Sequence, residues 1–445
     1  NGAMHSAGPR FFRHTTVIAV VIANMVGTGV FTSLGFQLLE IDSGFVLLLL
    51  WAVGGLVALC GAMTYAELGA ALPRSGGEYN FLSRIYHPAA GFVAGWTSVT
   101  IGFAGPTALA AMTFAAYATS ILELEQGQWL ERALAVSLVV LLAAVHGGKR
   151  EGSGGVQVGF TVLKVLVILG FCLAAILIVD EPQPVRFVPA SDDGALLTSA
   201  AFAVSLIYVS YAYTGWNAAT YLSSELENPQ RTLPGILLTG TIVVTVMYVG
   251  LNFVFLYAAP IAELRGQVEV GFIAATAAFG ELGGKLAGLV LATLLISTVS
   301  AMMMAGPRVL QVVGEDFQAL RLLARTNQDG IPATAVYLQA ALAILFILTS
   351  SFESVLLFAG FTLALNSFVT VLGIFVLRWR QPELERPYRT FLYPLPPLIY
   401  LALTGWTLWF VLVNRPVEAS VGLGVIASGL VVYALAGRSG RPAAR

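Results

Sequence analysis

The sequence predicts an all-α polytopic membrane protein with twelve transmembrane helices, and three observations support this fold class. Of the 445 residues, 57% are hydrophobic and only 11% are charged, and the mean hydropathy of the chain is +0.83. The apolar residues form twelve runs, of lengths suited to crossing a bilayer as helices. The positive charges gather on one side of these runs. Because helices satisfy their own backbone hydrogen bonds in lipid, we expect a helical bundle with hardly any soluble mass.

The twelve runs follow one another through mostly short connections. They comprise residues 16–38, 44–71, 89–120, 130–147, 156–179, 197–221, 234–258, 269–313, 334–350, 353–377, 391–413 and 418–436. The eighth range contains a single span near residues 286–310. We expect the outer segment before that span, residues 259–285, to form a lid or a surface helix.

The lysine and arginine residues predict how these spans are oriented. If the N-terminus lies inside the cell, 17 of the 23 lysine and arginine residues fall in inside segments, 5 fall outside, and Lys164 remains within the fifth span. The positive-inside rule then predicts that residues 1–15 and 437–445 are cytoplasmic and that the protein lies in the cell (inner or plasma) membrane. We expect residues 1–3, which precede a methionine, to be a remnant of a cleaved tag.

The residue clusters that carry enzymatic or metal chemistry are missing from the sequence. Both cysteines, Cys60 and Cys172, fall within spans, so they indicate neither a disulfide framework nor a metal site. No spaced histidine pair, carboxylate cluster, nucleophile elbow or phosphate loop is present. The sequence therefore predicts no cofactor, no metal ion, no nucleic-acid partner and no enzymatic activity.

The first span contains a motif that disfavours a continuous helix. Residues 25–31 read MVGTGVF, and each glycine costs a helix about 1 kcal/mol relative to alanine. Opened backbone at membrane depth is tolerated only where it lines a cavity, so we expect a polar ligand there. The freed amides and the positive end of the following half-helix suit a carboxylate. The alternative is that the small residues only let two helices pack closely.

The sixth span has a second such motif at its centre. Residues 208–221 read YVSYAYTGWNAATY, and an aromatic belt does not explain a Thr-Gly break at mid-depth. Interrupted spans at matching positions of two halves indicate an inverted-repeat transporter with its substrate at the midplane. The first repeat then covers residues 16–180 and the second covers residues 197–378, while residues 391–436 lie outside the repeat.

A lysine lies inside the fifth span. Burying Lys164 costs a few kcal/mol and requires partners that face the bundle interior. The hydroxyl residues of the eighth span are the candidate partners. The alternative is that Lys164 extends its ammonium group to the cytoplasmic surface.

Four motifs resemble those of the amino acid–polyamine–organocation (APC) superfamily of transporters, especially its L-type and cationic amino acid transporter branches. They are residues 25–31 (MVGTGVF), 73–79 (PRSGGEY), 211–217 (YAYTGWN) and 227–234 (ENPQRTLP). The resemblance covers spans one to ten. It implies a LeuT-like five-plus-five inverted repeat with broken helices one and six, in which spans 1, 2, 6 and 7 rock against spans 3, 4, 8 and 9.

The same resemblance implies a binding site for an amino acid at the two breaks. It assigns the substrate carboxylate to backbone amides and the substrate ammonium to backbone carbonyls. The implied amides are those of Gly27, Thr28 and Gly29, and the implied carbonyls are those of Val26, Tyr211, Ala212 and Thr214. Tyr211 stands at the position of the aromatic outer gate, and Asn217 stands at a polar pocket position.

Lys164 resembles the fifth-helix lysine of sodium-independent members, whose ammonium takes the place of a sodium ion between helices one and eight. Its partners are then expected among Ser297, Thr298 and Ser300. The resemblance thus implies sodium-independent amino acid transport, by exchange or by proton coupling. Proton coupling needs a titratable group, and Lys164, Glu67 and Glu78 are the candidates in the sequence.

The absence of an acid at mid-depth in spans 1, 3, 6 and 8 favours neutral amino acids as substrates. Neither cysteine lies outside the spans to pair with a second subunit, so no heavy-chain subunit is expected. The alternatives are a sodium- or proton-coupled transporter of amines or polyamines with the same fold, a membrane enzyme, and a non-transporting membrane receptor.

Overall fold

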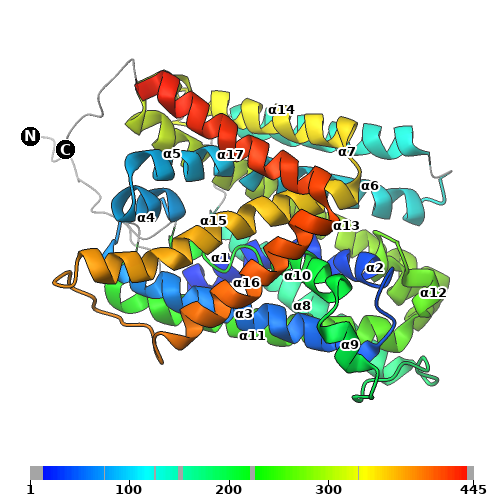
Figure 1. Ribbon diagram of the computed structural model, residues 1–445. Helices are drawn as coiled ribbons and strands as arrows, with labels where there is room; N and C mark the ends of the chain where they lie inside the picture. Colours follow the sequence, from blue (N-terminus) through cyan, green and yellow to red (C-terminus); the bar gives the residue numbers. More distant parts are fainter. Residues whose placement is uncertain are drawn as a thin grey trace, which may run out of the picture.

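The computed structural model describes residues 14–74, 76–124, 127–148, 154–220, 226–328 and 330–437. Residues 1–13 and 438–445 of the two predicted cytoplasmic termini lie outside these ranges. Within the described ranges the chain is mostly helical and contains no strand. The long helices run side by side in one bundle (Figure 1).

Nine helical stretches among the described residues are long and apolar enough to cross a membrane, and each coincides with a predicted span. They are α3 (Gly44–Ala71), the run from α5 to α6 (Pro88–Ile121), α7 (Gln128–Gly148), α8 (Gly154–Ile178), α11 (Pro229–Ala258), α13 (Val270–Asp316), α15 (Phe352–Arg380), α16 (Leu395–Asn414) and α17 (Pro416–Gly437). The run contains α5 (Pro88–Thr97), the π-helical turn η2 (Ser98–Gly102) and α6 (Ala104–Ile121). The polytopic helical architecture is therefore confirmed.

The other three predicted spans form shorter helices. Two of them are the spans predicted to be interrupted, and both interruptions are present. The first span consists of α1 (His14–Met25), η1 (Gly29–Phe31) and α2 (Ser33–Gln37). In the sixth span, α10 (Ala200–Ala212) ends at the Thr-Gly motif, and residues 221–225 lie outside the described ranges. The ninth span is α14 (Ala333–Thr349).

The segment before the eighth span is helical in two pieces. It contains the short helix α12 (Ile261–Leu264) and then the first turns of α13, which a kink at the non-helical residue Gly280 separates from the rest of that helix. Gly280 has a φ of +78°, which glycine adopts without the steric cost of a side chain. The remaining short helices are α4 (Glu78–Ile85), α9 (Asp193–Leu197) and η4 (Gln318–Ala324).

The helices pack in two groups. In the first group, α3 packs along α11, and α11 packs against α1, while α10 and α16 also contact α3. In the second group, α13 packs along α6, and α7 and α14 pack against α6 and each other. Figure 1 shows α3 and α11 along the lower side of the bundle and α7 and α14 along the upper side.

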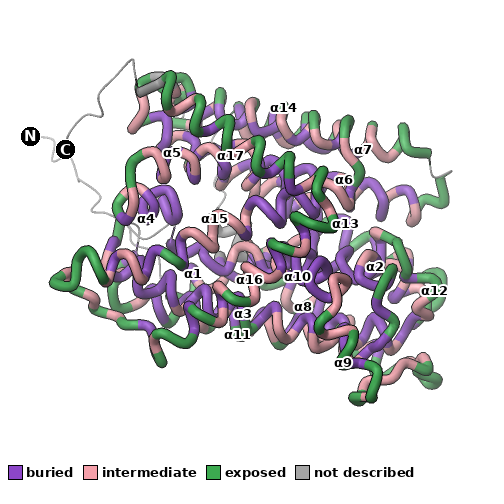
Figure 2. Tube along the Cα trace, in the orientation of Figure 1, coloured by how far each residue is buried: buried purple, intermediate pink, exposed green. Residues whose placement is uncertain are grey.

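Helix α8 has one exposed apolar face and one face buried against the protein. Leu166, Leu173 and Leu177 are more than half exposed, whereas Lys164 and Ile168 are almost fully buried. Figure 2 shows exposed residues along the outer helices and buried residues in the interior. An exposed apolar face of this length suits contact with lipid chains. Lys164 faces the bundle, so the alternative in which it extends to the surface is wrong.

Candidate functional site

The two broken segments lie against each other. At Gly29, a Cβ atom would lie 2.5 Å from the Cα of Ala212 and 2.7 Å from its Cβ. At Gly215, a Cβ would lie 2.7 Å from the carbonyl carbon of Asn24, and the φ of Gly215 is +108°. Both glycines therefore permit a close approach of backbone to backbone. The helix break and the close packing, which the sequence analysis treated as alternatives, occur together.

Three consecutive backbone amides are open at the first break. The N–H of Val26 completes the last turn of α1 by donating to the carbonyl of Ile22 at 2.8 Å, and the N–H of Gly27 donates to Met25 at 2.8 Å. The amides of Thr28, Gly29 and Val30 have no hydrogen-bond partner in the part of the chain that the structure describes. Buried amides normally have partners, so three adjacent open donors mark a place where an anion would be stabilised. Of the three amides predicted to bind the carboxylate, that of Gly27 already donates a hydrogen bond within the protein.

The carbonyls predicted to hold an ammonium group fall into two pairs. Tyr211 accepts a hydrogen bond from the N–H of Thr214 at 2.9 Å, and Ala212 accepts one from a side chain of α11, described next. The carbonyls of Val26 and Thr214 have no donor among the described residues. The second pair therefore keeps its acceptor capacity for a ligand.

Tyr248 on α11 joins the two breaks and was not identified from the sequence. Its hydroxyl contacts the carbonyl oxygens of both Met25 and Ala212, the latter at 2.9 Å. The Tyr248 ring is fully buried and packs edge-on against Trp51, with ring centroids 5.6 Å apart. Tyr213 in turn donates to the carbonyl of Trp51 at 3.0 Å. The only signal in the sequence was a tyrosine inside an apolar span, and the sequence pattern does not distinguish a bridging tyrosine from one that only packs.

Asn217 connects the second break to a buried carboxylate. Its amide nitrogen donates to Glu78 of α4 at 3.1 Å. Glu78 is 5% exposed and accepts further hydrogen bonds from Tyr65 at 2.7 Å, Ser367 at 3.1 Å and Asn366 at 3.2 Å. The predicted pocket position is thus occupied by a side chain that links the turn after α10 with α3, α4 and α15.

Lys164 is held by one of the three hydroxyl residues that the sequence left open. Its ammonium group donates to Thr298 at 2.9 Å, and a Cβ on Gly27 would lie 3.6 Å from the Cγ2 of Thr298. Ser300 instead pairs with His146 at 2.7 Å, and Ser297 is a buried hydroxyl with no partner among the described residues. Lys164 therefore reaches the neighbourhood of the first break through Thr298.

Tyr211 lies where α10 meets α15. A Cβ on Gly360 of α15 would lie 3.7 Å from that of Tyr211, and the tyrosine belongs to an apolar cluster that includes Ile101 of η2 and Leu109 of α6. Its side chain is thus buried in a cluster that also draws residues from η2, α6 and α15. Among the described residues, no group of three His, Cys, Asp or Glu side chains is arranged to hold a metal ion.

Comparisons with known proteins agree with this architecture. Residues 12–435 match the family described as "Amino acid permease". "Large neutral amino acids transporter small subunit 2" of Mus musculus is 29% identical, over 94% of this chain and 79% of that protein. "Asc-type amino acid transporter 1" of Mus musculus is 27% identical over the same shares. "Serine/threonine exchanger SteT" of Bacillus subtilis is 26% identical over 94% of both chains.

The family match extends over nearly the whole chain, and the relatives align along most of their own length. The resemblance found in the four sequence motifs is therefore confirmed. The chain belongs to the amino acid permease family of the APC superfamily, whose members are membrane transporters and not enzymes.

Proposed function

We propose that the protein is a sodium-independent secondary transporter of neutral amino acids, working by exchange or proton coupling in the cell membrane with both termini in the cytoplasm. The observation that carries this proposal is the contact between two broken helices, with open amides in the first break and one open carbonyl in each break, among the described residues. An amino acid presents a carboxylate and an ammonium group on one carbon, so it matches paired donors and acceptors. The names of the relatives point to neutral substrates and to exchange.

The substrate carboxylate is assigned to the amides of Thr28 and Gly29, with that of Val30 as a third donor. The substrate ammonium is assigned to the carbonyls of Val26 and Thr214. This assignment narrows the predicted set, because Gly27, Tyr211 and Ala212 already use the corresponding backbone groups within the protein. Tyr211 keeps its proposed role as the aromatic gate above the site.

Sodium independence rests on Lys164. The residue is 2% exposed, and its ammonium group bonds to Thr298, which lies beside Gly27 of the first break. A fixed cation beside opened backbone takes the position that a sodium ion would need, and the repulsion between two like charges at short range in a low dielectric is large. Lys164 therefore substitutes for a coupling ion.

The proposed motion follows the packing of the helices. Spans 1, 2, 6 and 7 correspond to the group containing α1, α3, α10 and α11, and spans 3, 4, 8 and 9 correspond to the group containing α6, α7, α13 and α14. Rocking of one group against the other, with repeats at residues 16–180 and 197–378, would open the site to either side. Cys60 and Cys172 are free thiols within α3 and α8, which is consistent with a transporter that works without a heavy-chain subunit.

The function is tested by counterflow in proteoliposomes. Unlabelled neutral amino acid inside should accelerate the uptake of labelled amino acid, and replacing sodium by potassium should leave the rate unchanged. A strict sodium requirement would contradict the role given to Lys164. Binding of the amino acid without any counterflow would support a receptor instead.

Gly29→Ala should abolish binding, whereas Gly27→Ala should largely keep it. The added methyl at Gly29 would lie 2.5 Å from the backbone of Ala212, which cannot move without shifting α10, but at Gly27 the nearest atom is 3.6 Å away. The measurement is the thermal stabilisation of the purified protein by its amino acid, compared with that of wild type. Equal stabilisation of the two variants would show that the contact of the breaks does not shape the site.

Tyr248→Phe should lower both stability and transport while leaving the aromatic packing in place. The variant leaves the buried carbonyl of Ala212 without a donor among the described residues, whereas that of Met25 keeps the N–H of Gly27. An unpaired buried group costs about 1–3 kcal/mol. The matched control is Tyr257→Phe, a half-buried tyrosine on the same helix whose hydroxyl has no hydrogen bond among the described residues. Melting temperature and counterflow are measured for both variants. If the Tyr248 variant resembles the Tyr257 variant in both, the hydroxyl of Tyr248 does not bridge the two breaks.

Lys164→Met should reduce counterflow at least about tenfold, since a hydrogen bond to a charged group contributes about 1.5–3 kcal/mol. Methionine keeps the length and apolar stem of lysine but removes the cation beside Thr298. Leu163→Met, at the neighbouring residue on the lipid-facing side of α8, is the control. Unchanged transport by the Lys164 variant would exclude the residue from coupling.

A further inference from the structure

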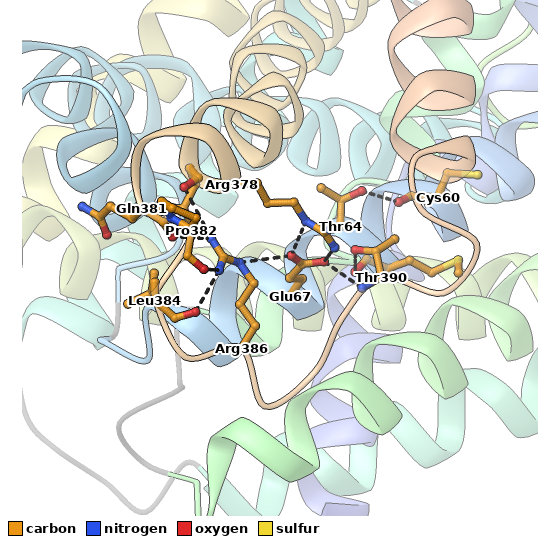
Figure 3. Close-up of polar contacts among 11 residues, drawn as sticks. Cys60, Thr64, Glu67, Arg378, Gln381, Pro382, Leu384, Arg386 and Thr390 are labelled. Carbon is orange, nitrogen blue, oxygen red and sulfur yellow. Dashed lines mark hydrogen bonds and ion pairs between the residues drawn. The ribbon is translucent and has the colours of Figure 1, made fainter.

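A cluster of charged side chains joins the end of α15 to α3 (Figure 3). Glu67 of α3 is 1% exposed and accepts two hydrogen bonds from Arg378, at 2.9 and 2.8 Å. The backbone N–H of Thr390 donates to the same carboxylate at 2.7 Å, and the Nε of Arg386 lies 3.5 Å from it. The loop of residues 381–394, which follows α15, is therefore folded back onto α3.

The cluster has more positive than negative charge. One carboxylate, that of Glu67, faces the guanidinium groups of Arg378 and Arg386, and Arg389 lies nearby. Burial lowers the pKa of Arg386 below its ordinary value; Glu67 opposes this shift, and the like charges of Arg378 and Arg389 add to it. The bidentate bond of Glu67 to Arg378 leaves Arg386 and Arg389 without a full counter-charge.

The two terminal nitrogens of Arg386 hydrogen-bond to the backbone of the loop and of the end of α15. Each of the two donates to backbone carbonyls of the loop or of the end of α15, such as that of Leu384 at 2.8 Å and that of Gln381 at 2.8 Å. Its Nε is buried and has no hydrogen-bond partner in the described part of the chain. The arginine is thus held rigidly in place, which reduces the entropy that a ligand would otherwise have to offset.

The three arginines line a cleft. Arg378, Pro382, Arg386 and Arg389 surround an open volume of about 230 Å³, much more than the ~30 Å³ that one water molecule takes in the liquid. Arg389 is exposed and has no polar partner within the described residues. The acidic residues of the same loop, Glu383 and Glu385, do not line the cleft. The cleft is therefore electropositive and has room for a polyatomic anion.

Large exposed apolar side chains are close in sequence to the arginines of the cleft. Trp379, next to Arg378, is 80% exposed, and Phe391 and Leu392, which follow Arg389 closely, are 67% and 62% exposed. Exposed tryptophan at the end of a membrane-spanning helix is typical of the headgroup region of a bilayer. The cleft therefore lies beside the position of lipid headgroups, at the interface that the charge distribution predicts to be cytoplasmic.

We propose that the cleft between Arg378, Arg386 and Arg389 binds a phosphate-bearing anion, and that the headgroup of an anionic phospholipid is its source. Guanidinium groups match phosphate oxygens in both geometry and charge, and basic pockets beside membrane helices suit anionic headgroups. Arg389, which has no polar partner among the described residues, is the main contact, while Arg386 supplies a fixed positive charge. A bound phosphate would fasten the loop to α15 and, through Arg378 and Glu67, to α3.

The test uses the full-length protein purified in a neutral detergent. Short-chain phosphatidylglycerol, phosphatidylcholine and inorganic phosphate are titrated separately, and the melting temperature is followed. The variant is Arg389→Gln, which removes an exposed side chain without a polar partner among the described residues. The matched control is Arg325→Gln, which removes another exposed arginine without a polar partner in the described part of the chain.

Phosphatidylglycerol, but not phosphatidylcholine, should stabilise wild type and the Arg325 variant. The Arg389 variant should bind it about tenfold more weakly, which corresponds to about 1.4 kcal/mol. If inorganic phosphate gives the same Arg389-dependent stabilisation, the anion site stands and its source is a soluble phosphate compound. If neither probe distinguishes the Arg389 variant from wild type, the proposal is wrong.

Discussion

Backbone groups opened inside an apolar bundle must find partners, and the central part of this structure follows from that constraint. α1 ends at Met25 and α10 ends at Ala212, so both ends expose carbonyls where water is scarce. The single hydroxyl of Tyr248 serves both of them. A hydroxyl has one proton and donates to one acceptor at a time. Met25 also accepts from the N–H of Gly27, so among the described residues the carbonyl of Ala212 depends on Tyr248 alone. The amides of Thr28, Gly29 and Val30 have no partner in the same part of the chain, which leaves this region polar.

The two breaks, far apart in sequence, behave as one structural unit. Gly29 against Ala212 and Gly215 against Asn24 bring backbone onto backbone, and Tyr248 bonds to both segments from a helix of the same packing group. A movement of that group would carry the whole unit without distorting it. Lys164 differs, because α8 packs against α1 and α11 of one group and also against α13 of the other, where the ammonium group bonds to Thr298. It therefore lies at the boundary where the two groups would separate.

The sequence was informative where a local pattern has only one physical explanation. Glycine and polar residues inside apolar runs predicted both breaks, and an isolated lysine predicted an interior partner. The identity of that partner depended on tertiary structure: of three neighbouring hydroxyls, Thr298 meets Lys164, Ser300 meets His146 and Ser297 meets neither. Tyr248 could not be singled out, because a bridging tyrosine and a packing tyrosine have the same sequence signature in an apolar span.

The two carboxylates considered for proton coupling are held in opposite ways. Glu67 accepts two hydrogen bonds from the charged guanidinium group of Arg378, which fix its carboxylate to the end of α15. Glu78 instead accepts hydrogen bonds from neutral groups, among them Asn217 at the second break and Ser367 on α15. Any motion that separates α10 from α4 and α15 has to break the bond between Asn217 and Glu78. Glu78 is therefore placed to respond to the state of the second break, whereas Glu67 anchors the loop after α15.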